Sequence, residues 1–216
     1  MEQEKLISRY PALYCAIGMA ISWLTVAAQF YLILANRTAS IPETITRFFS
    51  YFTILTNILV AVSFTLLFQR PRSRPWAFFL RPGILTAIAV YISIVSIVYN
   101  LVLRRLWNPQ GLQLLVDELL HSVIPVMFFL FWLLYVPKNR LSFKNLWGWL
   151  LYPFIYLAAI LVRGAVSGFY PYPFLDVNAK GYVKIFINIF ALLGGFLLFS
   201  IFLIMIAKFR RKEKIS

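Results

Sequence analysis

Six long runs of apolar residues, separated by short polar segments, dominate this sequence. Each run has about 20 residues, the length that an α-helix needs to cross roughly 30 Å of hydrocarbon. Segments rich in proline and basic residues, such as 70–75 and 137–144, separate neighbouring runs. The pattern predicts an all-α polytopic membrane protein, a single domain with a bundle of transmembrane helices over 13–35, 49–68, 84–103, 117–136, 146–166 and 185–207.

The composition agrees with this class. Hydrophobic residues make up 62% of the 216 positions, and the mean hydropathy is +0.81. One soluble core cannot hide so large an apolar share. The first run carries Trp23 and Gln29 and is too long for a signal peptide, so we expect it to remain as a helix. The single cysteine, Cys15, cannot form an internal disulfide.

Basic residues are divided unequally between the two sides of the membrane that six crossings define. The side with both termini would carry 14 Lys and Arg, and the other side 7. By the positive-inside rule, both termini should be cytoplasmic, with 208–216 as a basic cytoplasmic tail. We expect a multi-pass protein of the plasma (inner) membrane. Contacts with anionic membrane lipids account for the net charge of +14, so no nucleic-acid partner is expected.

Each predicted helix carries a polar side chain at nearly the same depth. These residues lie 15 to 19 positions from the cytoplasmic ends of their predicted helices. At about 1.5 Å per residue, they would share a layer roughly 6 Å thick. For the amides, Asn57 included, the alternative is hydrogen bonding that only joins helices. The shared depth predicts a polar cavity that opens toward the outer face, lined by Gln29, Thr53, Asn100, His121, Arg163 and Asn188.

His121, the only histidine, is the most unusual member of this layer. An ionisable group at membrane depth is costly, so its presence indicates a function. Asp117 lies one helical turn earlier, where its carboxylate can accept a hydrogen bond from the imidazole. Pro125 has no N–H for the carbonyl of His121, so the helix should bend and leave that carbonyl free. Alternatively, Asp117 and Glu118 only end the helix at the water interface.

These residue types favour nucleophilic catalysis over metal chemistry. A metal site would need three or four ligands, and with one histidine and one distant cysteine we consider only Asp117, Glu118 and Asp176 to complete it, so neither a metal nor another cofactor is expected. A nucleophile needs a hydroxyl within hydrogen-bond reach of a base. Thr53 supplies one at the depth of His121, with Thr56 and Ser50 as alternatives; a membrane threonine more often bonds to its own helix.

Three short segments carry a resemblance to a known family: FSYFTILTN at 49–57, HSVIP at 121–125 and YPFL at 172–175. Together they resemble the androgen-induced-protein family and its bacterial six-helix relatives. That resemblance implies a membrane threonine hydrolase that cleaves fatty acid esters of hydroxy fatty acids, with Thr53 as the nucleophile and His121 as its base. Because Thr53 and Thr56 both precede Asn57 closely, Thr56 is the alternative nucleophile.

A lipid-ester hydrolase of this kind would take its acyl ester from the outer leaflet. Asn57, Arg163 or a backbone N–H would stabilise the oxyanion. A basic rim at headgroup level would hold a substrate carboxylate, although ordinary snorkelling of long side chains is the alternative. This rim consists of Arg104, Arg105, Lys180 and Lys184.

Two other functions compete with hydrolysis. A small-solute or proton transporter or channel would use His121, Asp117 and Arg163 as a relay or binding site. The sequence shows no internal repeat, and its polar groups stop halfway across the membrane, which disfavours a conduit. A membrane partner protein without enzymatic activity is the third hypothesis.

Overall fold

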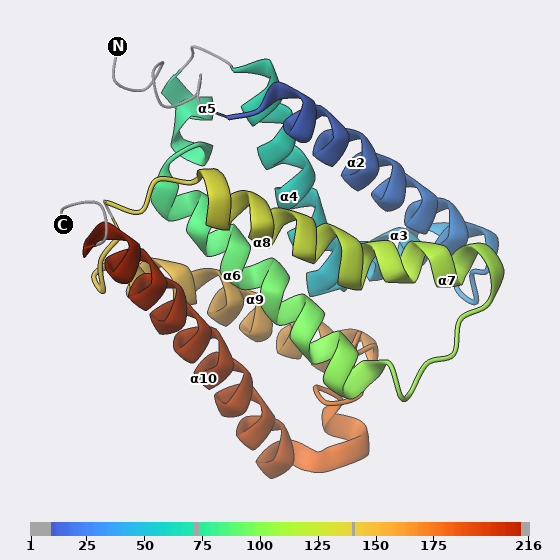
Figure 1. Cartoon of the computed structure of the whole chain (residues 1–216). Coiled ribbons are helices and arrows are strands. Elements are labelled where there is room, and N and C mark those ends of the chain that lie inside the picture. The colour runs from blue at the N-terminus through green and yellow to red at the C-terminus, as the bar shows by residue number, and fades with distance from the viewer. Residues whose placement is uncertain (1–9, 71–73, 140, 213–216) are drawn as a thin grey trace.

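The computed structural model describes residues 10–70, 74–139 and 141–212, and this part of the chain is helical without strands (Figure 1). Six of its helices are long and apolar enough to cross a membrane. In lipid, a helix satisfies its own backbone hydrogen bonds, which is why apolar runs of this length adopt it. The structure confirms the prediction of an all-α, multi-pass integral membrane protein.

The bounds of the helices follow the predicted runs with some differences. α7 begins at Gly111 rather than at 117, and α10 continues to Lys212, so positions 208–212 of the predicted tail are helical and 213–216 lie outside the described residues. α10 changes direction at Gly181, whose positive φ of 74° suits a residue without a side chain. The spanning elements are α2 (Ala12–Ala35), α4 (Phe52–Gln69), α6 with η1 (Pro82–Val98, Tyr99–Leu103), α7 with η2 and α8 (Gly111–Glu118, Leu119–Val123, Ile124–Tyr135), α9 (Asn145–Ser167) and α10 (Val177–Lys212), and the connections hold α3 (Ile41–Ser50) and α5 (Arg74–Phe79).

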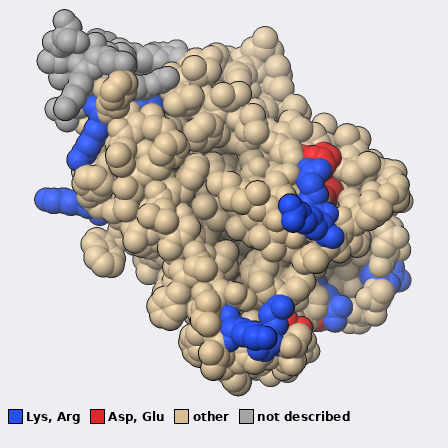
Figure 2. Space-filling view, turned by 60° about the horizontal axis from the view of Figure 1, so that its bottom comes forward, with Lys and Arg blue, Asp and Glu red and all other residues tan. Residues whose placement is uncertain are grey.

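The two ends of the bundle differ in the segments that form them. The start of α2 and the end of α10 lie at the same end of the bundle, which we call the terminal end (Figure 1). The connections 36–40, 104–110 and 168–176 form the opposite end, called the loop end. On the face shown in Figure 2, Lys, Arg, Asp and Glu gather in small groups, and a broad surface without charge separates them.

α6 lies in the centre of the bundle, in contact with α4, α8, α9 and α10 (Figure 1). The core around it is aromatic and includes the fully buried Phe64, Phe128 and Trp132. The indole nitrogen Nε1 of Trp132 donates to Thr86 Oγ1 at 2.9 Å. This bond gives the buried indole N–H an acceptor, which lipid chains cannot provide. α4 and α6 also both contact η2, the turn between α7 and α8.

A break at Tyr51 divides the segment predicted as one helix over 49–68 into α3 and α4. Tyr51 has an extended backbone, with φ −82° and ψ 123°. The first amides of α4 have no carbonyl within the helix, and tyrosine hydroxyls accept from them instead: Phe52 N–H bonds to Tyr156 at 3.1 Å and Thr53 N–H to Tyr172 at 3.2 Å. No proline or glycine marks the break, so the sequence pattern missed it.

Replacing Tyr156 by phenylalanine should destabilise this junction. The Tyr156 hydroxyl accepts from Phe52 N–H and donates to the carbonyl of Ser50 at 2.8 Å, so its loss leaves two buried backbone groups without partners. We expect a loss of about 1–3 kcal/mol of stability, measured by thermal unfolding in detergent. Tyr31→Phe, at an exposed tyrosine, is the control. An unchanged unfolding temperature in Tyr156→Phe would contradict this capping role.

Candidate functional site

His121 lies in the π-helical turn η2 and is buried, as is Asp117. Its Nδ1 is 2.9 Å from the carbonyl oxygen of Asp117 and 3.3 Å from the carboxylate oxygen Oδ1 of the same residue. Both oxygens only accept hydrogen bonds, so Nδ1 of the neutral ring must carry the hydrogen. The lone pair of Nε2 is then available for a proton, which is the state that a general base needs.

Tyr99 completes this group from the neighbouring helix. Its ring stacks on the imidazole of His121, with centroids 3.8 Å apart and planes within 12°. Its hydroxyl donates to Oδ2 of Asp117. Tyr99 therefore fixes both the carboxylate and one face of the imidazole. Sequence reasoning missed it, because one tyrosine in an apolar helix looks like any other; its place beside Asn100 was the only available signal.

A π-helical turn, η2, lies before Pro125, and the carbonyl of His121, which we expected to be free, accepts a hydrogen bond. Asn100 Nδ2 donates to it at 3.4 Å, and Asn57 Nδ2 donates to the carbonyl of Leu120 at 3.3 Å. The π-helical turn opens both carbonyls to these amides from α4 and η1. Amide side chains from two other helices thus fix the backbone carbonyls of Leu120 and His121.

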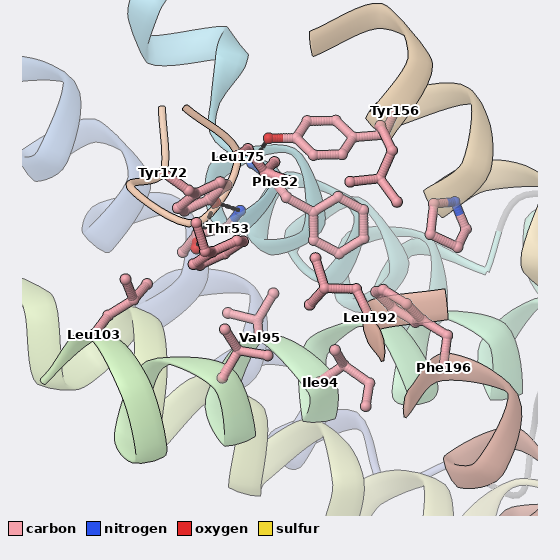
Figure 3. A pocket seen from close by; sticks show the side chains of 14 residues that line it. Phe52, Thr53, Ile94, Val95, Leu103, Tyr156, Tyr172, Leu175, Leu192 and Phe196 are labelled. Carbon is pink, nitrogen blue, oxygen red and sulfur yellow. Dashed lines mark hydrogen bonds between the residues drawn. The ribbon is translucent and has the colours of Figure 1, made fainter. Parts of the chain in front are cut away.

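Thr53, the second residue of α4, faces a different partner. Its Oγ1 lies 3.4 Å from the hydroxyl of Tyr172, which also accepts its N–H (Figure 3). Burial raises the pKa of Tyr172, so this hydroxyl remains a neutral donor at physiological pH. Among the described residues, no hydrogen bond joins Thr53 to His121.

A cavity of about 50 Å³ adjoins Thr53. Its walls come from α4, α6, α9, α10 and the 172–175 loop, and they are almost entirely apolar, with Val95, Leu192 and Phe196 among them (Figure 3). Such a lining suits an acyl chain rather than an ion. Thr53 is the only predicted site residue in the wall; Thr56 is fully buried elsewhere on α4.

Asn57 connects the two halves of the candidate site. Its Nδ2 donates both to the carbonyl of Thr53 at 2.8 Å and to that of Leu120 at 3.3 Å, which ties the Thr53 turn to the residue before His121. Both amide hydrogens are used, so this arrangement leaves none for an oxyanion. The buried Oδ1 of Asn57 has no hydrogen-bond partner among the described residues.

The remaining predicted residues bond to partners other than Thr53 and His121. Gln29 accepts from Gln113 at 2.9 Å, and Asn188 donates to the carbonyl of Phe174 at 2.8 Å. Arg163 pairs with Glu43 at 3.0 Å on the far side of α9. The polar layer is thus divided among several local contacts. In the predicted rim, Arg104 pairs with Glu118 at 2.6 Å, and the other members, which are exposed, are Arg105, Lys180 and Lys184.

Comparison of the chain with protein-family models, with curated proteins and with solved structures finds no match. The chemistry of the site therefore has to be argued from its own geometry.

Proposed function

We propose that this protein hydrolyses acyl esters of membrane lipids, with Thr53 as the nucleophile and His121 as the base. The observation that supports this most is the arrangement of His121, a buried imidazole whose Nδ1 is bonded to Asp117. Among the described residues, no hydrogen bond involves its Nε2. Asn57 holds the turn of Thr53 beside the turn of this imidazole. The apolar cavity at Thr53 offers room for part of an acyl chain.

The reaction would proceed in two steps, acylation of Thr53 and hydrolysis of the acyl-threonine. The Thr53 oxygen attacks the ester carbonyl carbon while its proton passes to Nε2 of His121. The bond to the alcohol oxygen then breaks, and the imidazolium returns the proton to this leaving group. Water hydrolyses the acyl-threonine in the same manner, with the proton passing through His121 back to Thr53 and a carboxylic acid released.

Substrate binding must change one contact seen in the structure. The Thr53 hydroxyl is bonded to Tyr172, so it has to exchange that partner for His121 or for a water bonded to His121. Tyr172, which lines the cavity, then loses its contact with the Thr53 oxygen and can turn its hydroxyl hydrogen toward the substrate. We assign stabilisation of the oxyanion to this hydroxyl rather than to Asn57, because a neutral donor in an apolar wall is well placed for developing negative charge.

The orientation of the chain is part of the proposal. The excess of Lys and Arg near the terminal end supports a cytoplasmic position for that end, with the loop end and the cavity at Thr53 toward the outer leaflet. A lipid ester would enter from that leaflet.

Labelling with a fluorophosphonate probe for serine and threonine hydrolases tests the proposal. Membranes with the native chain should give a labelled band, and Thr53→Ala should abolish it because the nucleophile is gone. His121→Ala should reduce the labelling rate by about 10²- to 10⁴-fold, the usual contribution of a general base. Thr56→Ala, three residues further along the same helix, should label like the native chain.

Two controls separate chemistry from folding. Thr53→Ser retains a hydroxyl and should retain labelling, and each variant should elute from size exclusion as the native protein does. Labelling that persists in a well-folded Thr53→Ala protein would overturn the proposal, and its loss in Thr56→Ala alone would transfer the nucleophile to that residue.

A further inference from the structure

A groove of about 770 Å³ runs along the surface between α3 and α9, apart from the cavity at Thr53. Its α9 side is apolar and exposed: Val162 and Val166 have 66% and 85% of their surface accessible. Ala158 and Ala159, which have small side chains, line it as well. In a bilayer this surface must be covered by lipid chains, and the two alanines let a chain approach the helix closely.

Two charged side chains, Glu43 from α3 and Arg163 from α9, line the groove, and Arg47 lies next to it, paired with Glu43. One carboxylate oxygen of Glu43 accepts from Arg47 Nε at 2.8 Å and from Arg163 Nη2 at 3.0 Å. Both guanidinium groups lie over the ring of Phe169, at 4.5 and 4.8 Å from its centroid. The hydrogen bond from Arg47 holds the pKa of Glu43 below its usual range, so the carboxylate is ionised at physiological pH.

The charges of this group do not cancel. Two guanidinium groups share one carboxylate, which leaves one positive charge beside an apolar groove. Glu43 uses one oxygen for both arginines, and Arg163 Nη1 donates to the carbonyl of Phe169 at 3.3 Å. The other N–H groups of the two guanidinium groups remain for a ligand. Arginine forks of this kind match the oxygens of a phosphate. Sequence reasoning singled out Arg163 for function, and the proposed hydrolase does not use it.

We propose that this groove binds one anionic phospholipid, with an acyl chain along α9 and the phosphodiester held by Arg163 and Arg47. A phospholipid with one net negative charge balances the one uncompensated positive charge. Its chain would lie over Ala158 and Ala159 and its headgroup at the ends of α3 and α9. The site is independent of the hydrolysis proposed at Thr53.

Native mass spectrometry of the purified protein tests this lipid site. Protein extracted from vesicles of phosphatidylcholine and phosphatidylglycerol at three to one is expected to retain one phosphatidylglycerol. Arg163→Gln should lower that retention by about tenfold, the effect of losing one charge-assisted contact. Glu43→Gln should raise it, because it removes the competing carboxylate.

Matched variants distinguish the site from general lipid contact. Ala159→Leu fills the groove without changing any charge and should also lower retention, whereas Ala191→Leu, at an exposed alanine on α10, should not. Arg37→Gln, at an exposed arginine of the loop end, should leave retention unchanged. Equal retention of the two phospholipids, or unchanged retention in Ala159→Leu, would overturn the proposal. Displacement of phosphatidylglycerol by added palmitate would assign the site to a fatty acid and would equally overturn it.

Discussion

In protein labelled with isotopic nitrogen at its single histidine, the neutral imidazole of His121 is expected to carry its hydrogen on Nδ1. Free histidine in water prefers the other tautomer. The reversal follows from the two oxygens of Asp117 at 2.9 and 3.3 Å from Nδ1, neither of which can donate. Nitrogen resonances of a protonated Nδ1 and a bare Nε2, read by NMR in detergent, would verify this. Because the chain has one histidine, no assignment of the spectrum is needed.

Variants of Tyr99 separate its two contacts. Tyr99→Phe retains the stacked ring and loses only the hydroxyl bonded to Asp117, so the Nδ1–H tautomer should persist. Tyr99→Ala removes the stacking face, so the imidazole should rotate and populate both tautomers. Tyr31→Ala, at an exposed tyrosine, is the matched control. A dominant Nε2–H tautomer in the native protein would contradict the role of His121 as a base through Nε2, whether or not hydrolysis is detected.

Gly18→Leu is expected to destabilise the packing of α2 on α4 by about 3 kcal/mol, the upper part of the usual cost of overpacking. A Cβ atom at Gly18 would lie 2.7 Å from Cδ2 of Phe64. Phe64 is fully buried and packs against Phe128 and Phe131 at centroid distances of 5.3 and 5.5 Å, so its ring has no room to move away. Small residues at such crossings let membrane helices approach closely.

Cys15 provides the measurement for Gly18→Leu. It is the only cysteine and is fully buried one turn from Gly18, so a thiol-reactive fluorophore should label it only when α2 separates from the bundle. Labelling should begin at a lower temperature in Gly18→Leu. Gly194→Leu is the matched control, because no atom lies within 4 Å of a Cβ there. Equal onset temperatures for these two variants would contradict the prediction that close packing at Gly18 stabilises the contact of α2 with α4.

The apolar runs were enough to predict the fold class and the number of spanning helices. The limits of the helices were harder to obtain, because a helix that enters or leaves lipid needs no proline or glycine at its end. The break at Tyr51 depends on hydroxyls of Tyr156 and Tyr172, which come from segments more than a hundred positions away. A local pattern cannot report partners at that distance.

The pairing of Asp117 with His121 was predictable, because residues four apart share a face of one helix. Counting residues also placed Thr53, Asn100 and His121 in the same half of the bundle. The count did not show which of them meet. Arg163 was assigned to the same depth, yet it pairs with Glu43 beside the surface groove along α9.

The sequence by itself determined that the chain has six helices long and apolar enough to cross a membrane, and it predicted that costly polar groups lie in one half of the bundle. Only the tertiary structure decided that Tyr99 holds His121, that Tyr172 bonds Thr53 and that Asn57 joins the two turns. The physical reason is the solvent. In water, an apolar stripe reveals which face of a helix is buried, but in lipid both faces are apolar, so the sequence leaves the rotation of each helix open. Packing between helices sets that rotation, and with it the neighbours of every polar side chain.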